Sequence, residues 1–197
     1  QSPDSNPFSI YAVTPHIAGD QPPALPIIIS HPAANTTSSM LVIDARQLPL
    51  GTVIQLDNVR FASIVGAARV TSGNGKSFAA GDDRNQFIVS SGEDDILSGG
   101  SGDDTIGSLG GNDQTSGDAG NDTLYGGTGN DVLNGGTGDD RINGGFGFDS
   151  AIQAGQLSNY RVTVHGNAVT LTNGEADTLT DVELVRFASG PSLAIAY

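Results

Sequence analysis

Apolar residues recur at a fixed interval of nine in the second half of the chain. Residues 90–152 divide into seven consecutive nonapeptides with an apolar or small eighth residue in all but one. These eighth positions are Leu97, Ile106, Thr115, Leu124, Leu133, Ile142 and Ala151. One inward position in each unit indicates a short strand, because side chains alternate across a strand. Units this small cannot bury a core alone, so the period predicts a repeat stack that shares one thin core.

The polar positions of the same nonapeptides are equally regular. Asp holds the sixth position in every unit, at Asp95, Asp104, Asp113, Asp122, Asp131, Asp140 and Asp149. Glycine dominates the first, second and fourth positions. Glycine tolerates positive φ, so such a segment forms a tight turn that exposes main-chain carbonyl groups. The pattern predicts an oxygen-lined turn before each short strand.

Stacking these turns creates an electrostatic problem. Two nonapeptides make one coil of 18 residues, so the aspartates fall into two columns: 95, 113, 131, 149 and 104, 122, 140. Carboxylates on strands about 4.8 Å apart repel by about 0.9 kcal/mol at the permittivity of water, and more at lower permittivity. The columns therefore require a cation between successive coils. Carboxylate and carbonyl oxygens favour calcium, and the repeats contain neither Cys nor His.

The repeats resemble the RTX (repeats-in-toxin) calcium-binding nonapeptides, whose pattern is GGxGxDxUx with U apolar. Gly126–Asn134 and Gly135–Asn143 match this pattern at every defined position. The resemblance implies an all-β, parallel β-roll, which is a right-handed β-solenoid, with calcium held in the turns. The metal-site residues carried over are Asp95, Asp104, Asp113, Asp122, Asp131, Asp140, Asp149, Gly100, Gly102, Gly127, Gly129, Gly136 and Gly138. The two columns offer three gaps and two gaps, which predicts about five ions.

Three other segments flank the array at 90–152. Residues 1–36 carry seven of the nine prolines and are expected to be an extended arm or linker. Residues 37–89 contain short β-rich runs separated by glycine, and we expect capping rungs that keep the core but lose the metal. Residues 153–197 begin with a predicted hairpin, Tyr160–Val164 followed by Ala168–Thr172. We expect this C-terminal region to cap the roll.

Charge and composition narrow the function classes. The chain has 22 acidic and 8 basic residues, and residues 82–149 hold 14 acids against two arginines. This excess argues against nucleic acid or an anionic membrane as a partner. A solvated acidic tail would give the same charge, but the acids here are phased with glycine and an apolar position. No apolar run is long enough to predict a membrane span.

Catalytic motifs are missing from the sequence. His16, His31 and His165 lie far apart, and there is no HExxH or GxSxG motif. Gly75-Lys76-Ser77 ends like a phosphate-binding loop, but Val70 stands where the first glycine is required. Metal binding accounts for the paired carboxylates, so we predict that the chain is not an enzyme.

Two function hypotheses remain from different classes. The string from Asp177 to Ala188 resembles the segment that follows such arrays in many type I secreted proteins. This resemblance implies a secreted module that folds on calcium outside a bacterial cell, with the export machinery and a passenger domain of the same polypeptide as partners. The alternative is a calcium-rigidified surface module of an adhesin or surface-layer protein, which contacts a partner at the cell surface. An ice-binding solenoid needs a ladder of Thr, and the third positions supply only Thr128 and Thr137.

Overall fold

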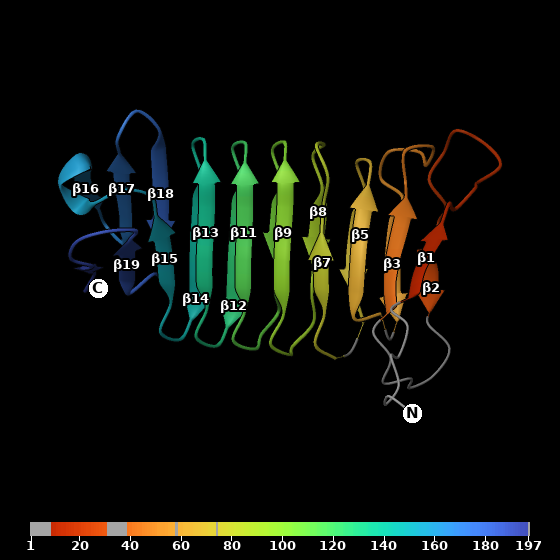
Figure 1. The fold of residues 1–197 in the computed structure, drawn as a ribbon, viewed down its shortest axis with the longest axis horizontal. Coiled ribbons are helices and arrows are strands. Elements are labelled where there is room, and N and C mark those ends of the chain that lie inside the picture. The colour runs from red at the N-terminus through yellow and green to blue at the C-terminus, as the bar shows by residue number, and fades with distance from the viewer. Residues whose placement is uncertain (1–8, 31–38, 58, 74, 197) are drawn as a thin grey trace, which may run out of the picture.

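The computed structural model describes residues 9–30, 39–57, 59–73 and 75–196 of the chain. In these residues the chain winds through two facing parallel sheets and forms an elongated stack of coils (Figure 1). Odd-numbered strands up to β15 fall in one sheet and even-numbered strands up to β14 in the other, so each coil contributes one strand to each sheet. This is the predicted all-β parallel β-roll, and the fold-class prediction is confirmed.

The first sheet contains ten strands within the described residues. In spatial order they are β1 (Ser9–Val13), β3 (Ser39–Asp44), β5 (Phe61–Val65), β7 (Phe78–Ala80), β9 (Ile96–Ser101), β11 (Gln114–Ala119), β13 (Val132–Thr137), β15 (Ser150–Gln153), β19 (Leu184–Phe187) and β20 (Leu193–Ala194).

The second sheet likewise has ten strands in the described part of the chain. Their order is β2 (Ile27–Ser30), β4 (Val53–Asp57), β6 (Arg69–Ser72), β8 (Phe87–Val89), β10 (Thr105–Gly107), β12 (Thr123–Thr128), β14 (Arg141–Phe146), β18 (Ala176–Thr180), β17 (Ala168–Thr172) and β16 (Arg161–His165).

Strand register in the array follows the nonapeptide period. Thr105 pairs with Thr123, and Leu124 pairs with Ile142, so neighbouring strands are offset by 18 residues. The same offset already joins β6 to β8 and β7 to β9. Further toward the N-terminus the offsets vary: Phe61 pairs with Phe78, Ile54 with Val70 and Leu41 with Ala62. The strict coil length therefore begins near residue 70.

Each sheet contributes one column of inward-pointing side chains to the core. All seven predicted eighth-position residues are buried, including Thr115 at 3% exposure. Ile43, Ile54, Ile64 and Ile88 extend the same core toward the N-terminus. Each inward position is flanked by outward ones, which gives the alternating burial of β4 and β5. The stack therefore buries little more than one apolar side chain per strand, as the sequence pattern predicts.

The proline-rich segment takes part in the stack. β1 pairs with β3, and β2 pairs with β4, so the segment interpreted as an arm supplies the outermost strand of each sheet in the described residues. Its prolines at 15, 22, 23 and 26 lie between β1 and β2 rather than inside them, where each would have removed a ladder donor. Residues 1–8 and 31–36 of this segment lie outside the described residues, and the division of the chain into four segments stays a prediction.

The C-terminal region ends the roll with antiparallel strands. β16 and β17 form the predicted hairpin, with Val162 opposite Leu171. β17 then pairs antiparallel with β18, which returns to the roll and pairs in parallel with β14. β19 pairs in parallel with β15 and antiparallel with β20. A single-turn 3-10 helix, η1 (Leu157–Asn159), connects β15 to β16. Among the described residues, no helix is long and apolar enough to span a membrane.

Candidate metal centre

The seven predicted aspartates lie in the turns between the two sheets, in two columns on opposite edges of the stack. Every one of them is buried, with 0 to 2% of its surface exposed. Seven buried carboxylates in a core that is one side chain wide are unusual, because charged groups are rarely buried unless they are paired. The two oxygens of each carboxylate have different environments, and this difference defines the site.

The first oxygen, Oδ1, joins successive coils. In each column it accepts the main-chain N–H of the aspartate one coil earlier. The N···Oδ1 distances are 2.6 Å for Asp95 to Asp113, 2.8 Å for Asp104 to Asp122, 2.8 Å for Asp113 to Asp131, 2.9 Å for Asp122 to Asp140 and 2.8 Å for Asp131 to Asp149. The predicted columns are therefore continuous hydrogen-bonded chains.

The second oxygen, Oδ2, is buried without a hydrogen-bond partner in all seven aspartates. An unpaired anionic oxygen in the interior carries a desolvation cost of several kcal/mol. Burial raises the pKa of the Asp104 carboxyl to about 7, with a smaller contribution from neighbouring carboxylates. Burial likewise raises the pKa values of Asp131 and Asp140 to about 6, and adjacent acids in the column add to both shifts. The columns are thus strained when they carry their full charge at neutral pH.

Main-chain carbonyl groups line the space beside each Oδ2. A Cβ placed on Gly117 would lie 2.3 Å from Asp122 Oδ2 and 2.5 Å from the oxygen of Gly135, one coil further on. A Cβ on Gly129 would lie 1.7 Å from the oxygen of Gly111, one coil back. The first-position carbonyl of the next coil therefore lies close to Oδ2, and the fourth-position carbonyl of one coil faces the fourth-position glycine of the next. Only glycine leaves this space free.

Positive φ angles at the glycines set the direction of the main-chain carbonyl groups in the turns. The predicted site glycines Gly100, Gly102, Gly127, Gly129, Gly136 and Gly138 all have φ between 102° and 133°. L-residues rarely adopt this conformation, so the repeat needs glycine at the second and fourth positions. Asp118 occupies a second position with φ 75°, and Ser116 supports its side chain by donating a hydrogen bond at 2.7 Å. The glycines thus shape the site, although their role as ligands stays a prediction.

These gaps fit a hard divalent cation. Within the described residues no three His, Cys, Asp or Glu side chains converge. A cation in a gap would therefore take carboxylate oxygens from the aspartates and the rest of its ligands from main-chain carbonyls. Such an all-oxygen set suits calcium, which accepts six to eight oxygen ligands in flexible geometry. The unpartnered Oδ2 atoms and the space that a Cβ would fill both support this assignment.

A β-roll with oxygen-lined turns defines the class of calcium-binding repeat solenoids. Residues 80–114 and 116–151 match the RTX calcium-binding nonapeptide repeat (4 copies). The matched residues are therefore RTX repeats, and the prediction that the nonapeptides belong to this repeat family is confirmed. No curated protein matches the chain. RTX repeats bind calcium, so this chain contains a calcium-binding module, whose repeats and solenoid are structural rather than catalytic.

The N-terminal ends of the columns carry neutral residues at the sixth position. Ser77 precedes Asp95, and its N–H and Oγ both donate to Asp95 Oδ1, at 2.6 and 2.8 Å. Gln86 precedes Asp104 and donates its N–H to Asp104 Oδ1 at 2.6 Å. The hydrogen-bonded chain thus continues one coil beyond the first aspartates, but the gap there holds one carboxylate in place of two.

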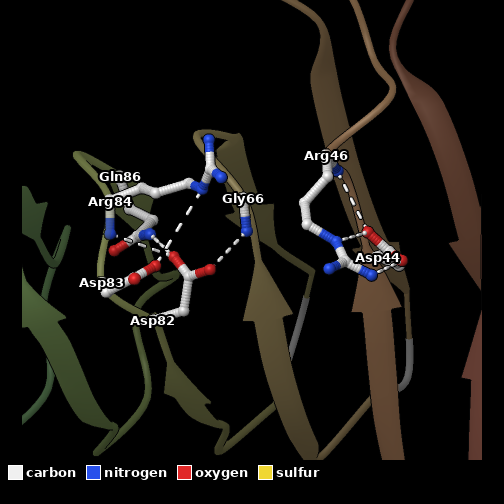
Figure 2. A network of polar contacts seen from close by, with 7 residues as sticks. All are labelled: Asp44, Arg46, Gly66, Asp82, Asp83, Arg84 and Gln86. Carbon is white, nitrogen blue, oxygen red and sulfur yellow. Dashed lines mark hydrogen bonds and ion pairs between the residues drawn. The ribbon is translucent and has the colours of Figure 1, made fainter.

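Acidic side chains at this end of the stack have protein donors as partners, and one of these contacts joins two coils (Figure 2). The Gln86 amide donates to Asp82, whose other carboxylate oxygen accepts the N–H of Gly66 at 2.7 Å. Arg46 pairs with Asp44 at 2.7 Å on the neighbouring coil, and the guanidinium lowers the pKa of that carboxyl to about 2. Asp44 and Asp82 thus have protein donors as partners for both carboxylate oxygens, which the array Oδ2 atoms lack.

Two acidic residues beyond the array continue the columns and were missed by sequence reasoning. Asp177 Oδ1 accepts the N–H of Asp140 at 3.0 Å, and Glu183 Oε2 accepts the N–H of Asp149 at 2.7 Å. The signal for Asp177 was present, because Thr172–Thr180 (TNGEADTLT) resembles the first nonapeptide, Ser90–Ser98 (SSGEDDILS). The hairpin inserted before it breaks the count of nine.

Proposed function

We propose that this chain is a calcium-triggered folding module that supports type I secretion and extracellular folding of a larger exported protein. The observation that carries the proposal is the set of seven buried Oδ2 atoms without partners. The proposed ligands are the seven array aspartates together with the carbonyls of the site glycines, and the array gaps would hold about five ions.

The energetics favour an unfolded chain when calcium is scarce. The stack buries a core one side chain wide, so little apolar burial offsets the desolvation of the carboxylates. A divalent cation in each gap supplies the missing partner for Oδ2 and cancels the repulsion along the column. Because the gap exists only in the stacked state, the free energy of ion binding becomes free energy of folding.

Calcium concentration would then decide where the module folds. Extracellular calcium modules bind with dissociation constants of about 10⁻⁴–10⁻³ M, which match the medium rather than the bacterial cytoplasm. RTX repeats are typical of secreted bacterial proteins, and this supports an extracellular location. An unfolded chain passes through an export channel, and folding at the exit would prevent its return and help the passenger domain to fold.

Circular dichroism of the chain with and without calcium tests the proposal. We expect a disordered spectrum in chelator and a cooperative gain of β signal when calcium is added in excess. Magnesium serves as the control, because it prefers near-ideal octahedral geometry and keeps its water ligands. An unchanged β spectrum after complete chelation at neutral pH would refute calcium-triggered folding.

A surface interaction module is the second candidate function. Phe146 and Phe148 lie in the last turn of the array and expose 79% and 54% of their surface. Two exposed aromatic side chains on a rigid turn are suited to contact with a partner, since aromatic residues are enriched at interfaces. Calcium-dependent retention of the folded chain on bacterial cells would support this function, and loss of retention in Phe146→Ser with Phe148→Ser would locate the contact.

A further inference from the structure

The aspartate columns do not end where the nonapeptides end. Asp140 and Asp149 are the last sixth-position residues of their columns, yet both N–H groups are hydrogen-bonded to acidic side chains of the C-terminal region. We propose that Asp177 and Glu183 close two further calcium sites, so that the C-terminal cap binds metal as part of the roll. This inference rests on the calcium sites proposed for the array.

The second column continues into Asp177 with the contacts of a normal repeat. Ala176 donates its N–H to Asp139 Oδ1 at 2.7 Å, as Asn121 does to Asp103 Oδ1 at 2.9 Å. The N–H of Thr178 reaches the oxygen of Asp140 at 2.8 Å, the same distance as from Thr123 to Asp104. Residues 176–180 therefore occupy positions five to nine of a nonapeptide, and Asp177 stands at position six.

The gap between Asp140 and Asp177 shares the buried, unpartnered oxygen of the array gaps on its Asp140 side, while the Asp177 carboxyl has the Gln153 side chain as a further hydrogen-bond partner. Asp140 is 1% exposed and its Oδ2 has no partner, and Asp177 is 6% exposed. The sequence separation is 37 residues rather than 18, because the hairpin is inserted between them. A cavity of about 310 Å³ lies beside Asp140 and is lined by Asn121, Asp139, Asp140, Arg141, Ala176 and Thr178.

The first column continues into Glu183 through a different backbone path. A Cβ on Gly144 would lie 2.0 Å from the oxygen of Asp181, just as a Cβ on Gly126 would lie 2.3 Å from the oxygen of Gly144. Asp181 has φ 50°, a conformation that turns its carbonyl toward this gap. The turn at 181–183 thus replaces both the first-position carbonyl and the sixth-position carboxylate of a repeat.

The partner of Glu183 in this gap is Asp149, which is fully buried. Asp149 is 0% exposed, and its Oδ2 has no hydrogen-bond partner. The N–H of Leu184 donates to the oxygen of Asp149 at 3.1 Å, as that of Ser150 does to Asp131 at 2.8 Å. A short turn reaches this place because glutamate is one methylene longer than aspartate. An ion here would bridge the last array coil and β19.

The two ends of the columns differ in charge. At the N-terminal end Ser77 and Gln86 supply neutral groups, so each of those gaps has a single carboxylate. At the C-terminal end each gap is flanked by two carboxylates, as in the array, where each interior carboxylate is shared by two successive gaps. Five array gaps and two cap gaps therefore give seven gaps that are each flanked by two carboxylates. Docking of the cap is then itself calcium-dependent.

Counting bound calcium in the full chain tests the inference. The metal is measured by elemental analysis after gel filtration in buffered calcium, and we expect seven ions per chain rather than five. Asp177→Asn and Glu183→Gln should each lose one ion. Both keep an amide oxygen that accepts the N–H of Asp140 or Asp149, so the β spectrum at high calcium should persist.

Asp139→Asn is the matched control. It removes one charge beside the same gap but keeps the acceptor for the Ala176 N–H, as Asn112, Asn121 and Asn130 do at the equivalent position. This variant should bind the wild-type number of ions.

Five ions in the wild type, or an unchanged count in both cap variants, overturns the inference and leaves the proposed function standing. If one variant does not fold, the other column and the wild-type count still decide. A chain that binds no calcium overturns both.

Discussion

Replacing Asp122 with Asn should change stability in opposite directions with and without calcium. Asp122 is the middle residue of its column: its Oδ1 accepts the N–H of Asp104 at 2.8 Å, and its own N–H donates to Asp140 Oδ1 at 2.9 Å. Asparagine keeps the shape and the accepting oxygen, so both hydrogen bonds can persist. The substitution places an NH₂ group where Oδ2 faces the oxygen of Gly135.

Without calcium the substitution relieves strain. Burial raises the pKa of the Asp122 carboxyl, so the charged form is disfavoured in the stack. Repulsion from each of two neighbours about 4.8 Å away amounts to about 0.9 kcal/mol in water, and to about 3.5 kcal/mol at an effective permittivity near 20. Removing both repulsions should stabilise the calcium-free stack by about 2–7 kcal/mol.

With calcium the same substitution removes an anionic ligand from two gaps. Truncating one partner of a buried charge pair costs about 3–5 kcal/mol, and the NH₂ group repels the ion. Urea unfolding followed by circular dichroism gives the free energy of unfolding in saturating calcium. In chelator the wild type is expected to be disordered at neutral pH, so calcium-free stability is measured as the pH midpoint at which β signal appears on acidification, which should be higher in the variant. Asp103→Asn is the control, because this exposed fifth position already holds Asn in three other coils. A shift of equal sign in both conditions would refute the electrostatic account of the columns.

Two further predictions follow from the same geometry. Burial raises the pKa values of the Asp104, Asp131 and Asp140 carboxyls in the stack to about 6 to 7, above the unfolded value of 3.8, so the calcium-free stack binds extra protons. This contribution to stability is fully present below pH 3.8 and is lost as the pH rises through about 6 to 7. The metal-free chain should therefore gain β signal on acidification from neutral pH, and a flat pH titration would contradict the shifts. Gly129→Ala should weaken calcium binding and destabilise the folded chain by about 1–3 kcal/mol, because its φ is 133° and Cβ would overlap the oxygen of Gly111. Calcium titration checks this, with Gly92→Ala as the control because a Cβ at Gly92 meets nothing within 4 Å. Equal calcium affinities of the two variants would exclude the proposed steric cause.

The array could be predicted from the sequence because each position has one physical role. Leu124 and Leu133 fill the core, Asp122 and Asp131 build the columns, and the glycines close the turns. A constant spacing of nine then fixes the register without knowledge of any contact. The hairpin of β16 and β17 could also be predicted, because a short Gly-containing turn joins two segments in which apolar and polar residues alternate.

The two ends could not be predicted in the same way. Coils before residue 70 have unequal lengths, and their strands lack the recurring Asp and Gly positions. Residues 1–36, which contain β1 and β2, were therefore interpreted as an extended arm or linker. Asp177 and Glu183 lie 37 and 34 residues after their partners, beyond an insertion that breaks the count. Their place depends on strand pairing between distant segments, which periodicity alone does not encode.

The hydrogen bonds between coils give the stack a direction. In every case the N–H belongs to the earlier coil and the accepting carboxylate oxygen to the later one. A chain shortened from its C-terminal side would leave the N–H of its last aspartate without the carboxylate acceptor, whereas one shortened from its N-terminal side would leave a carboxylate oxygen without that donor. The two ends of the stack are therefore unlike, because a cation can satisfy an open acceptor but not an open donor.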